Sequence, residues 1–149
     1  MLDLILEFVH HVAIFSLVAV IAAEFVLIVP GLTGNRLQQA GALDGAYGGL
    51  AGLIVIVGVA RVIWGESGWE FYVYNWTFWV KMALFVAVGL ISIRPTMTIL
   101  GWRRAARADP AFAVPADAVT GIRGFFYAQF ALLALIPIFA ALMARGIGL

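Results

Sequence analysis

The stretch of residues 124–144 carries no charged side chain and is apolar along nearly its whole length. An α-helix needs about 20 such residues to cross the hydrocarbon core of a lipid bilayer. Three more stretches are predominantly apolar and hold few charges, so the sequence predicts four spans, over residues 2–29, 45–64, 74–93 and 124–144. The expected fold class is all-α: an up-and-down bundle of four transmembrane helices, with residues 1–149 forming a single transmembrane domain.

The overall composition excludes several other classes of protein. Hydrophobic residues make up 64% of the 149 residues and charged residues 11%, whereas a soluble domain is roughly half apolar and about a quarter charged. The chain has no cysteine, which excludes a disulfide framework and a cysteine zinc site. The net charge of +1 gives no electrostatic case for binding nucleic acid. The expected partner is the lipid bilayer.

The positive charges are distributed unevenly between the two ends of the predicted bundle. The loops after the first and third spans hold six of the nine, namely Arg36, Arg94, Arg103, Arg104, Arg107 and Arg123. The other three are Arg61, Lys81 and Arg145. Short loops rich in arginine face the cytoplasm. The sequence therefore predicts a multi-pass protein of the bacterial inner membrane with both termini on the periplasmic side.

Ionisable side chains gather at one depth in the outer half of the predicted bundle. His10 and His11 in the first span, Arg61 in the second and Lys81 in the third lie at similar distances from the outer face. Glu7 precedes the histidines by about one helical turn, from where it can reach either ring. Charged groups inside a bilayer are costly, and each is by default a candidate for a functional site.

These side-chain types suit an anionic ligand or cofactor. Imidazole can ligate haem iron or another metal, and arginine and lysine bind carboxylates. The set therefore indicates a haem or other tetrapyrrole, a quinone or a similar anionic ligand, and with it the activity of a membrane oxidoreductase. Adjacent helical positions point about 100° apart, so either His10 or His11, and not both, would ligate the iron of a haem b.

Two other functions remain open from the sequence. Arg61 and Lys81 can extend toward lipid headgroups, which would leave a structural or accessory subunit without chemistry of its own. Alternatively, a small oligomeric transporter would have Glu24 or Lys81 lining its pathway.

Other polar and small residues are expected to have structural roles. Glu24, near the inner end of the first span, is expected to form an ion pair with Arg94 or Arg123. Gln129 is expected to bridge helices, and Tyr47 to lie at the membrane interface. Glycines spaced four apart allow a close approach of another helix, within the bundle or in a homo-oligomer: Gly45, Gly48, Gly49 and Gly52.

Several short motifs carry a resemblance to known families. They are His10-His11 with Glu24, Asp44-x-x-Tyr47-Gly48, Gly65-Glu66-x-Gly68-Trp69-x-x-Tyr72, Asn75-x-x-Phe78-Trp79-x-Lys81 and Ile93-x-Pro95-Thr96. With them the chain resembles, over nearly its whole length, an uncharacterised bacterial family of four-helix inner-membrane proteins. More distantly, its layout is similar to the haem-associated membrane protoporphyrinogen oxidases of the HemJ type. That similarity implies a histidine of the first helix and the Trp79-x-Lys81 element as parts of a tetrapyrrole site.

The predicted topology can be tested with reporter fusions at each terminus. Alkaline phosphatase, which is active only outside the cytoplasm, should be active when fused to either end of the chain. A cytoplasm-dependent reporter should be active only when inserted in the loops after the first and third spans. Phosphatase activity confined to those loops would contradict the assignment.

Overall fold

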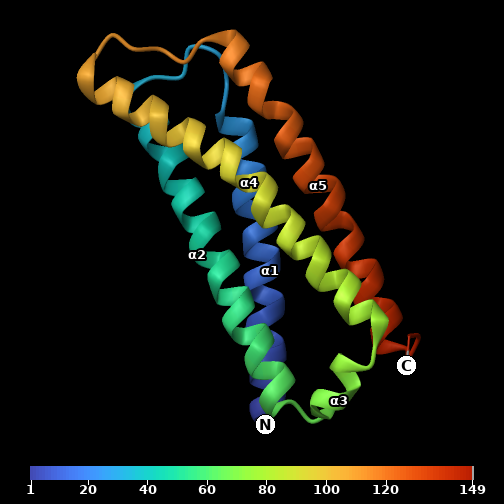
Figure 1. Cartoon of the computed structure of the whole chain (residues 1–149). Coiled ribbons are helices and arrows are strands. Elements are labelled where there is room, and N and C mark those ends of the chain that lie inside the picture. The colour runs from blue at the N-terminus through green and yellow to red at the C-terminus, as the bar shows by residue number, and fades with distance from the viewer. Residues whose placement is uncertain (149) are drawn as a thin grey trace.

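The computed structural model describes residues 1–148 and consists of helices joined by short loops (Figure 1). The helices are α1 (Leu2–Leu27), α2 (Gly34–Trp64), α3 (Gly68–Val73), α4 (Trp76–Ala108) and α5 (Ala116–Ala144). All except α3 are long and apolar enough to cross a membrane. They run alternately up and down, which confirms the predicted all-α fold with four spans.

Three of the long helices extend beyond the spans predicted from hydropathy. α2 begins at Gly34 instead of residue 45, α4 continues to Ala108 instead of ending at residue 93, and α5 begins at Ala116 instead of residue 124. At 1.5 Å per residue, α4 is about 50 Å long, against a hydrocarbon core of about 30 Å. The added turns hold most of the arginines, so they fit the polar headgroup region and the water beyond it.

The added turns are helical because their buried faces continue the faces of the spans. On α2, Leu37 and Ala40 are fully buried, and on α4 the buried positions Ile99 and Trp102 lie three residues apart. Such spacing places the side chains on one side of a helix. A hydropathy average misses these turns because the opposite side of each carries charged residues.

The helices form two hairpins. α1 packs against α2 and α4 packs against α5 over most of their lengths, whereas α2 and α4 meet over a much shorter stretch. Both termini and the connection containing α3 lie at one end, called the terminus half below (Figure 1). The loops at residues 28–33 and 109–115 lie in the other half, called the loop half. The boundary between the hairpins, mainly between α2 and α4, is called the seam.

Backbone hydrogen bonds fasten both ends of the bundle. In the loop half, Gly31 N donates to Val114 O at 2.8 Å and Val114 N donates to Leu32 O at 3.1 Å. In the terminus half, Trp76 N donates to Gly148 O at 3.1 Å. The first two bonds join the loops of different hairpins, whereas the third joins the start of α4 to the segment that follows α5, within one hairpin. Backbone hydrogen bonds thus tie the hairpins together in the loop half, and the segment containing α3 connects them at the other end.

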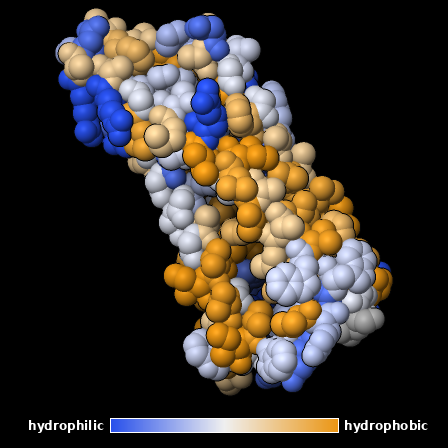
Figure 2. All heavy atoms as spheres, in the orientation of Figure 1, coloured by the Kyte–Doolittle hydropathy of each residue, from blue (hydrophilic) through white to orange (hydrophobic). Residues whose placement is uncertain are grey.

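The surface is apolar in the middle and polar at the loop end, as a membrane protein requires. Figure 2 shows hydrophobic side chains over the central part and strongly hydrophilic ones gathered at the end of the loop half. Many large apolar residues point outward, among them Phe15, Val26 and Leu90. Since lipid tails cover such side chains, their exposure needs no partner protein.

The glycines of α2 do not provide the close helix contact expected within the bundle. Each of Gly45, Gly48, Gly49 and Gly52 is exposed, and no atom of another helix lies within 4 Å of the place where a Cβ would be. The expectation of close packing within the bundle is therefore wrong for these four positions. Contact with a second copy through this face stays a prediction.

Core packing on α1 yields a stability prediction. Leu17 is 1% exposed and Val18, next to it, is 39% exposed. Leu17→Ala should lower the free energy of unfolding by about 2 kcal/mol, near the lower end of the range for buried leucines, because lipid is as apolar as the core and mainly the cavity cost remains. Val18→Ala should change it by less than about 0.5 kcal/mol. Thermal or SDS unfolding in detergent measures both, and equal losses would contradict the packing.

Candidate functional site

The terminus half brings together the ionisable side chains predicted from three helices. His10 comes from α1, Arg61 from α2 and Lys81 from α4. Arg61 and Lys81 both lie within electrostatic reach of the His10 ring, and Lys81 lies within reach of Arg61. These three side chains, with Glu7, are called the basic cluster below.

His10 points into the bundle and lacks a partner for one ring nitrogen. Its ring packs against Gly58 of α2: a Cβ atom added to this glycine would lie 3.5 Å from His10 Cε1. Its Nδ1 atom is buried and has no hydrogen-bond partner among residues 1–148. A buried polar atom without a partner costs free energy. This nitrogen is therefore available for a hydrogen bond with a bound molecule.

Arg61 forms an ion pair with Glu7. Their side-chain atoms Nη2 and Oε1 are 3.6 Å apart, and the glutamate side chain is 47% exposed. Solvent or headgroup contact of this kind makes such a pair weak. The Nε atom of Arg61 is buried without a hydrogen-bond partner among residues 1–148, so the ion pair leaves part of the guanidinium unused.

Lys81 is half-buried and makes no ion pair within the described part of the chain. The contact identified for its ammonium group is the ring of Phe78, with Nζ 5.8 Å from the ring centroid. The cluster thus holds two cations, Arg61 and Lys81, against one carboxylate, that of Glu7. This excess of positive charge favours an anion.

His11 lies apart from the cluster. It is exposed on the outer side of α1, and its Nδ1 donates to the backbone carbonyl of Glu7 at 2.8 Å. The two histidine rings lie 6.3 Å apart at an angle of 88°, as expected for neighbours on a helix. Of the two histidines, His10 is therefore the one that can contact a ligand inside the bundle.

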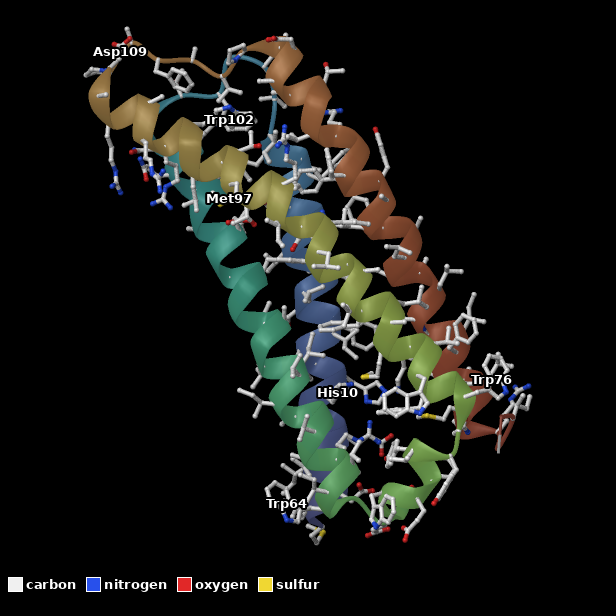
Figure 3. The ribbon with its side chains drawn as sticks, in the orientation of Figure 1. His10, Trp64, Trp76, Met97, Trp102 and Asp109 are labelled. Carbon is white, nitrogen blue, oxygen red and sulfur yellow. The ribbon has the colours of Figure 1, made fainter. Side chains whose placement is uncertain are left out.

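A hollow opens on the surface at the level of His10. Figure 2 shows it between α2 and α4, with hydrophilic atoms visible inside. Figure 3, drawn from the same side, labels His10 at this level. The basic cluster is thus reachable from the seam.

The ion pairs expected for Glu24 are not formed among residues 1–148. Arg123 instead donates from Nη2 to the carbonyl of Ile28 at 3.3 Å and lies over the ring of Phe25, 5.0 Å from its centroid. Arg94 is exposed. Arg123 is held at the end of α1, one turn beyond Glu24, where it satisfies a terminal carbonyl. The buried Oε1 of Glu24 is left without a partner.

A second polar group, missed in the sequence, lies on the seam in the loop half. Tyr47 is buried instead of interfacial, and its hydroxyl donates to Gln129 Oε1 at 3.1 Å, which confirms that Gln129 bridges helices. Thr96 Oγ1 donates to Asp44 Oδ1 at 2.6 Å. Asp44 was expected to precede the second span. Its helical spacing from Leu37 and Tyr47, which places the three residues on one face of α2, could have indicated that it is buried.

Comparison with known proteins identifies a family. The model of the family "Predicted membrane protein (DUF2214)" matches residues 2–148, so the chain belongs to this family, as the resemblance to an uncharacterised membrane family implied. No curated protein matches the chain, and no solved structure matches it. Nothing in these comparisons supports the similarity to HemJ-type oxidases.

The unpaired charge of Lys81 yields a stability prediction. Lys81→Met should raise the free energy of unfolding by about 1 kcal/mol, because it removes a charge whose insertion costs up to about 3 kcal/mol and loses one cation–π contact of about 0.5–1 kcal/mol. Arg36→Met, at the exposed start of α2, should have no measurable effect. Thermal unfolding in detergent measures both. A clear loss of stability in Lys81→Met would show that the lysine is structural.

Proposed function

From the premise that the chain is a four-span member of this membrane family, we propose that it binds an amphipathic anion in the terminus half. The ligand's acidic group contacts Arg61 and Lys81, and a further polar group contacts His10. The ligand reaches this place through the hollow between α2 and α4. The apolar remainder of the ligand lies along the seam or among the lipid tails.

One observation carries this proposal: the two buried, unpartnered nitrogens, His10 Nδ1 and Arg61 Nε. They come from different helices, and they accompany an excess of positive charge at the same level. A structural role would be expected to satisfy such atoms within the protein. A bound molecule with a carboxylate or a quinone-type oxygen would satisfy them instead.

A tetrapyrrole is the ligand class that would use all three nitrogen-bearing side chains of the cluster. Its propionates would pair with Arg61 and Lys81. In haem, the iron would have His10 as its histidine ligand, and it would supply redox chemistry when bound. A quinone would use His10 and Lys81 as partners of its oxygens and leave the second cation to the ion pair with Glu7.

The location follows from the same charges. We infer that the protein lies in a bacterial inner membrane with the terminus half outside, because most of the arginines lie in the loop half. The basic cluster then faces the periplasmic leaflet, from which an anionic ligand would enter.

The proposal is tested by titrating the purified protein, in nanodiscs of zwitterionic lipid, with haemin and with iron-free protoporphyrin IX. Both should bind and quench tryptophan fluorescence, since Trp64 follows Arg61 by about one turn of α2 and Trp79 precedes Lys81 by two residues on α4. Lys81→Met should weaken the binding of both about tenfold to a hundredfold, as expected for the loss of a charged contact of about 1.5–3 kcal/mol. Porphyrin binding that is the same in Lys81→Met and the wild type would contradict the proposal.

The two histidines provide a matched control. His10→Ala should change the Soret spectrum of bound haemin and should weaken protoporphyrin binding less, because that ligand has no iron. His11→Ala should leave both unchanged, since its ring lies on the outer side of α1. An effect in His11→Ala equal to that in His10→Ala would indicate a general effect of the substitutions. If neither porphyrin binds, binding of a short-chain ubiquinone distinguishes a quinone site from a protein without a ligand here.

A further inference from the structure

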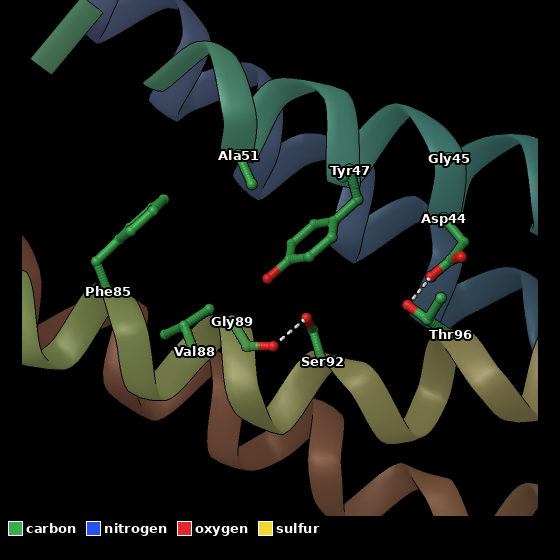
Figure 4. A pocket seen from close by; sticks show the side chains of 10 residues that line it. Asp44, Gly45, Tyr47, Ala51, Phe85, Val88, Gly89, Ser92 and Thr96 are labelled. Carbon is green, nitrogen blue, oxygen red and sulfur yellow. Dashed lines mark hydrogen bonds between the residues drawn. The ribbon is translucent and has the colours of Figure 1, made fainter. Parts of the chain in front are cut away.

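A pocket of about 280 Å³ lies on the seam in the loop half (Figure 4). α2 contributes Asp44, Tyr47 and Ala51 to its lining, and α4 contributes Phe85, Ser92 and Thr96. Seventeen residues separate Asp44 from Arg61 on α2, which is about 25 Å along the helix. The carboxylate end of the pocket is therefore distant from the basic cluster, whereas Phe85, at its other end, follows Lys81 by about one turn of α4.

The pocket has a carboxylate at one end. Asp44 Oδ1 accepts the hydrogen bond from Thr96, as Figure 4 shows, and its other oxygen makes no hydrogen bond within residues 1–148. No cationic nitrogen of the described residues lies within ion-pair distance of Asp44. Arg103, which acts on Asp44 from further away, donates from Nε to Gln38 Oε1 at 3.2 Å.

A second buried carboxyl group lies in this region. Glu24 of α1 is only 2% exposed, and its Oε1 has no partner among residues 1–148. It lies within electrostatic reach of both Asp44 and Tyr47. Two carboxyl groups thus share one buried region, and neither forms an ion pair among residues 1–148.

The rest of the lining suits an organic cation. The rings of Tyr47 and Phe85 lie along the pocket (Figure 4), and aromatic faces attract quaternary and other ammonium ions. The Tyr47 hydroxyl points between α2 and α4 and can still accept a hydrogen bond, since it donates its proton to Gln129. Pockets for drug-sized ligands measure about 300–1,000 Å³, so this pocket would hold a molecule of about one ring.

The pocket is open beside its glycines. Gly45, Gly48 and Gly89 line it and are exposed. A Cβ atom added to any of these three glycines would have no neighbouring atom within 4 Å. In a bilayer, this side faces the acyl chains, so a membrane-soluble molecule can enter laterally.

We propose that the pocket between α2 and α4 binds a small amphipathic organic ammonium ion, with Asp44 as its counter-ion. The apolar body of the ligand contacts Ala51 and Phe85. The protein then has two sites of opposite charge preference on one seam.

The test measures binding of radiolabelled phenyltrimethylammonium to the protein in zwitterionic nanodiscs. The wild type should bind it saturably, and tert-butylbenzene, its neutral isostere, should compete poorly. Asp44→Asn should weaken binding about tenfold to a hundredfold. The amide oxygen of this variant can still accept the bond from Thr96, so the fold should persist.

A second variant tests the pocket without changing a charge. Gly89→Leu places a side chain in the open space of the pocket and should abolish binding. Gly52 is an exposed glycine of α2 that does not line the pocket, so Gly52→Leu should leave binding unchanged. Equal binding by Asp44→Asn and the wild type would overturn the proposal. Equal competition by the neutral isostere, or saturable binding of Na⁺ with none of the ammonium ion, would overturn it as well.

Measuring each variant in the binding assay of the other site distinguishes the two sites. Lys81→Met should bind the ammonium ion like the wild type, and Asp44→Asn should bind porphyrin like the wild type. Failure of the porphyrin titrations alone leaves the pocket proposal intact. Loss of ammonium binding in Lys81→Met would show that the probe occupies the basic cluster and would overturn the assignment to the pocket.

Discussion

The seam between the two hairpins determines where this protein can hold polar groups. α1 and α2 pack closely, as do α4 and α5, and apolar side chains fill both contacts. α2 and α4 meet over less of their length. Backbone hydrogen bonds join the hairpins at the loop end, and the segment containing α3 connects them at the other end. Between those ends, the seam leaves room for side chains that must neither face lipid nor enter a packed core.

Titratable side chains lie at two levels along the seam. The terminus half holds Arg61 and Lys81 beside His10, whereas the loop half holds Asp44 and Glu24. In a bilayer, a charge without water or a partner is expensive. A chain that needed only stability would replace these residues with apolar ones, and often at a gain. Their presence at two levels of one seam is therefore the physical reason to expect ligands there.

Much of the fold is predictable from the sequence because a spanning helix has a simple requirement. Apolar stretches of sufficient length identified all four spans and their alternating directions. The helix ends were less predictable, since the turns around Leu37 and Trp102 combine a buried face with charged residues, and an average over the window conceals the face. The short helix α3 was missed as well, because six residues provide no periodic signal.

The candidate site was predictable only in part. Depth along each helix predicted that His10, Arg61 and Lys81 lie at one level. Depth alone did not show which of two adjacent histidines faces inward, because that depends on the rotation of α1 about its axis. The partner of Arg123 and the burial of Asp44 and Tyr47 depend on contacts between distant segments. Spacing within one helix does not contain that information.

The proposed ligand site requires His10 of α1 and Lys81 of α4 to lie close together at one level of the bundle, within electrostatic reach of each other. The natural chain has no cysteine, so paired cysteines can be introduced without background. A short bifunctional thiol reagent should cross-link His10→Cys with Lys81→Cys in membranes, and should fail with the pair His11→Cys and Lys81→Cys. Cross-linking of the second pair and not the first would contradict the account.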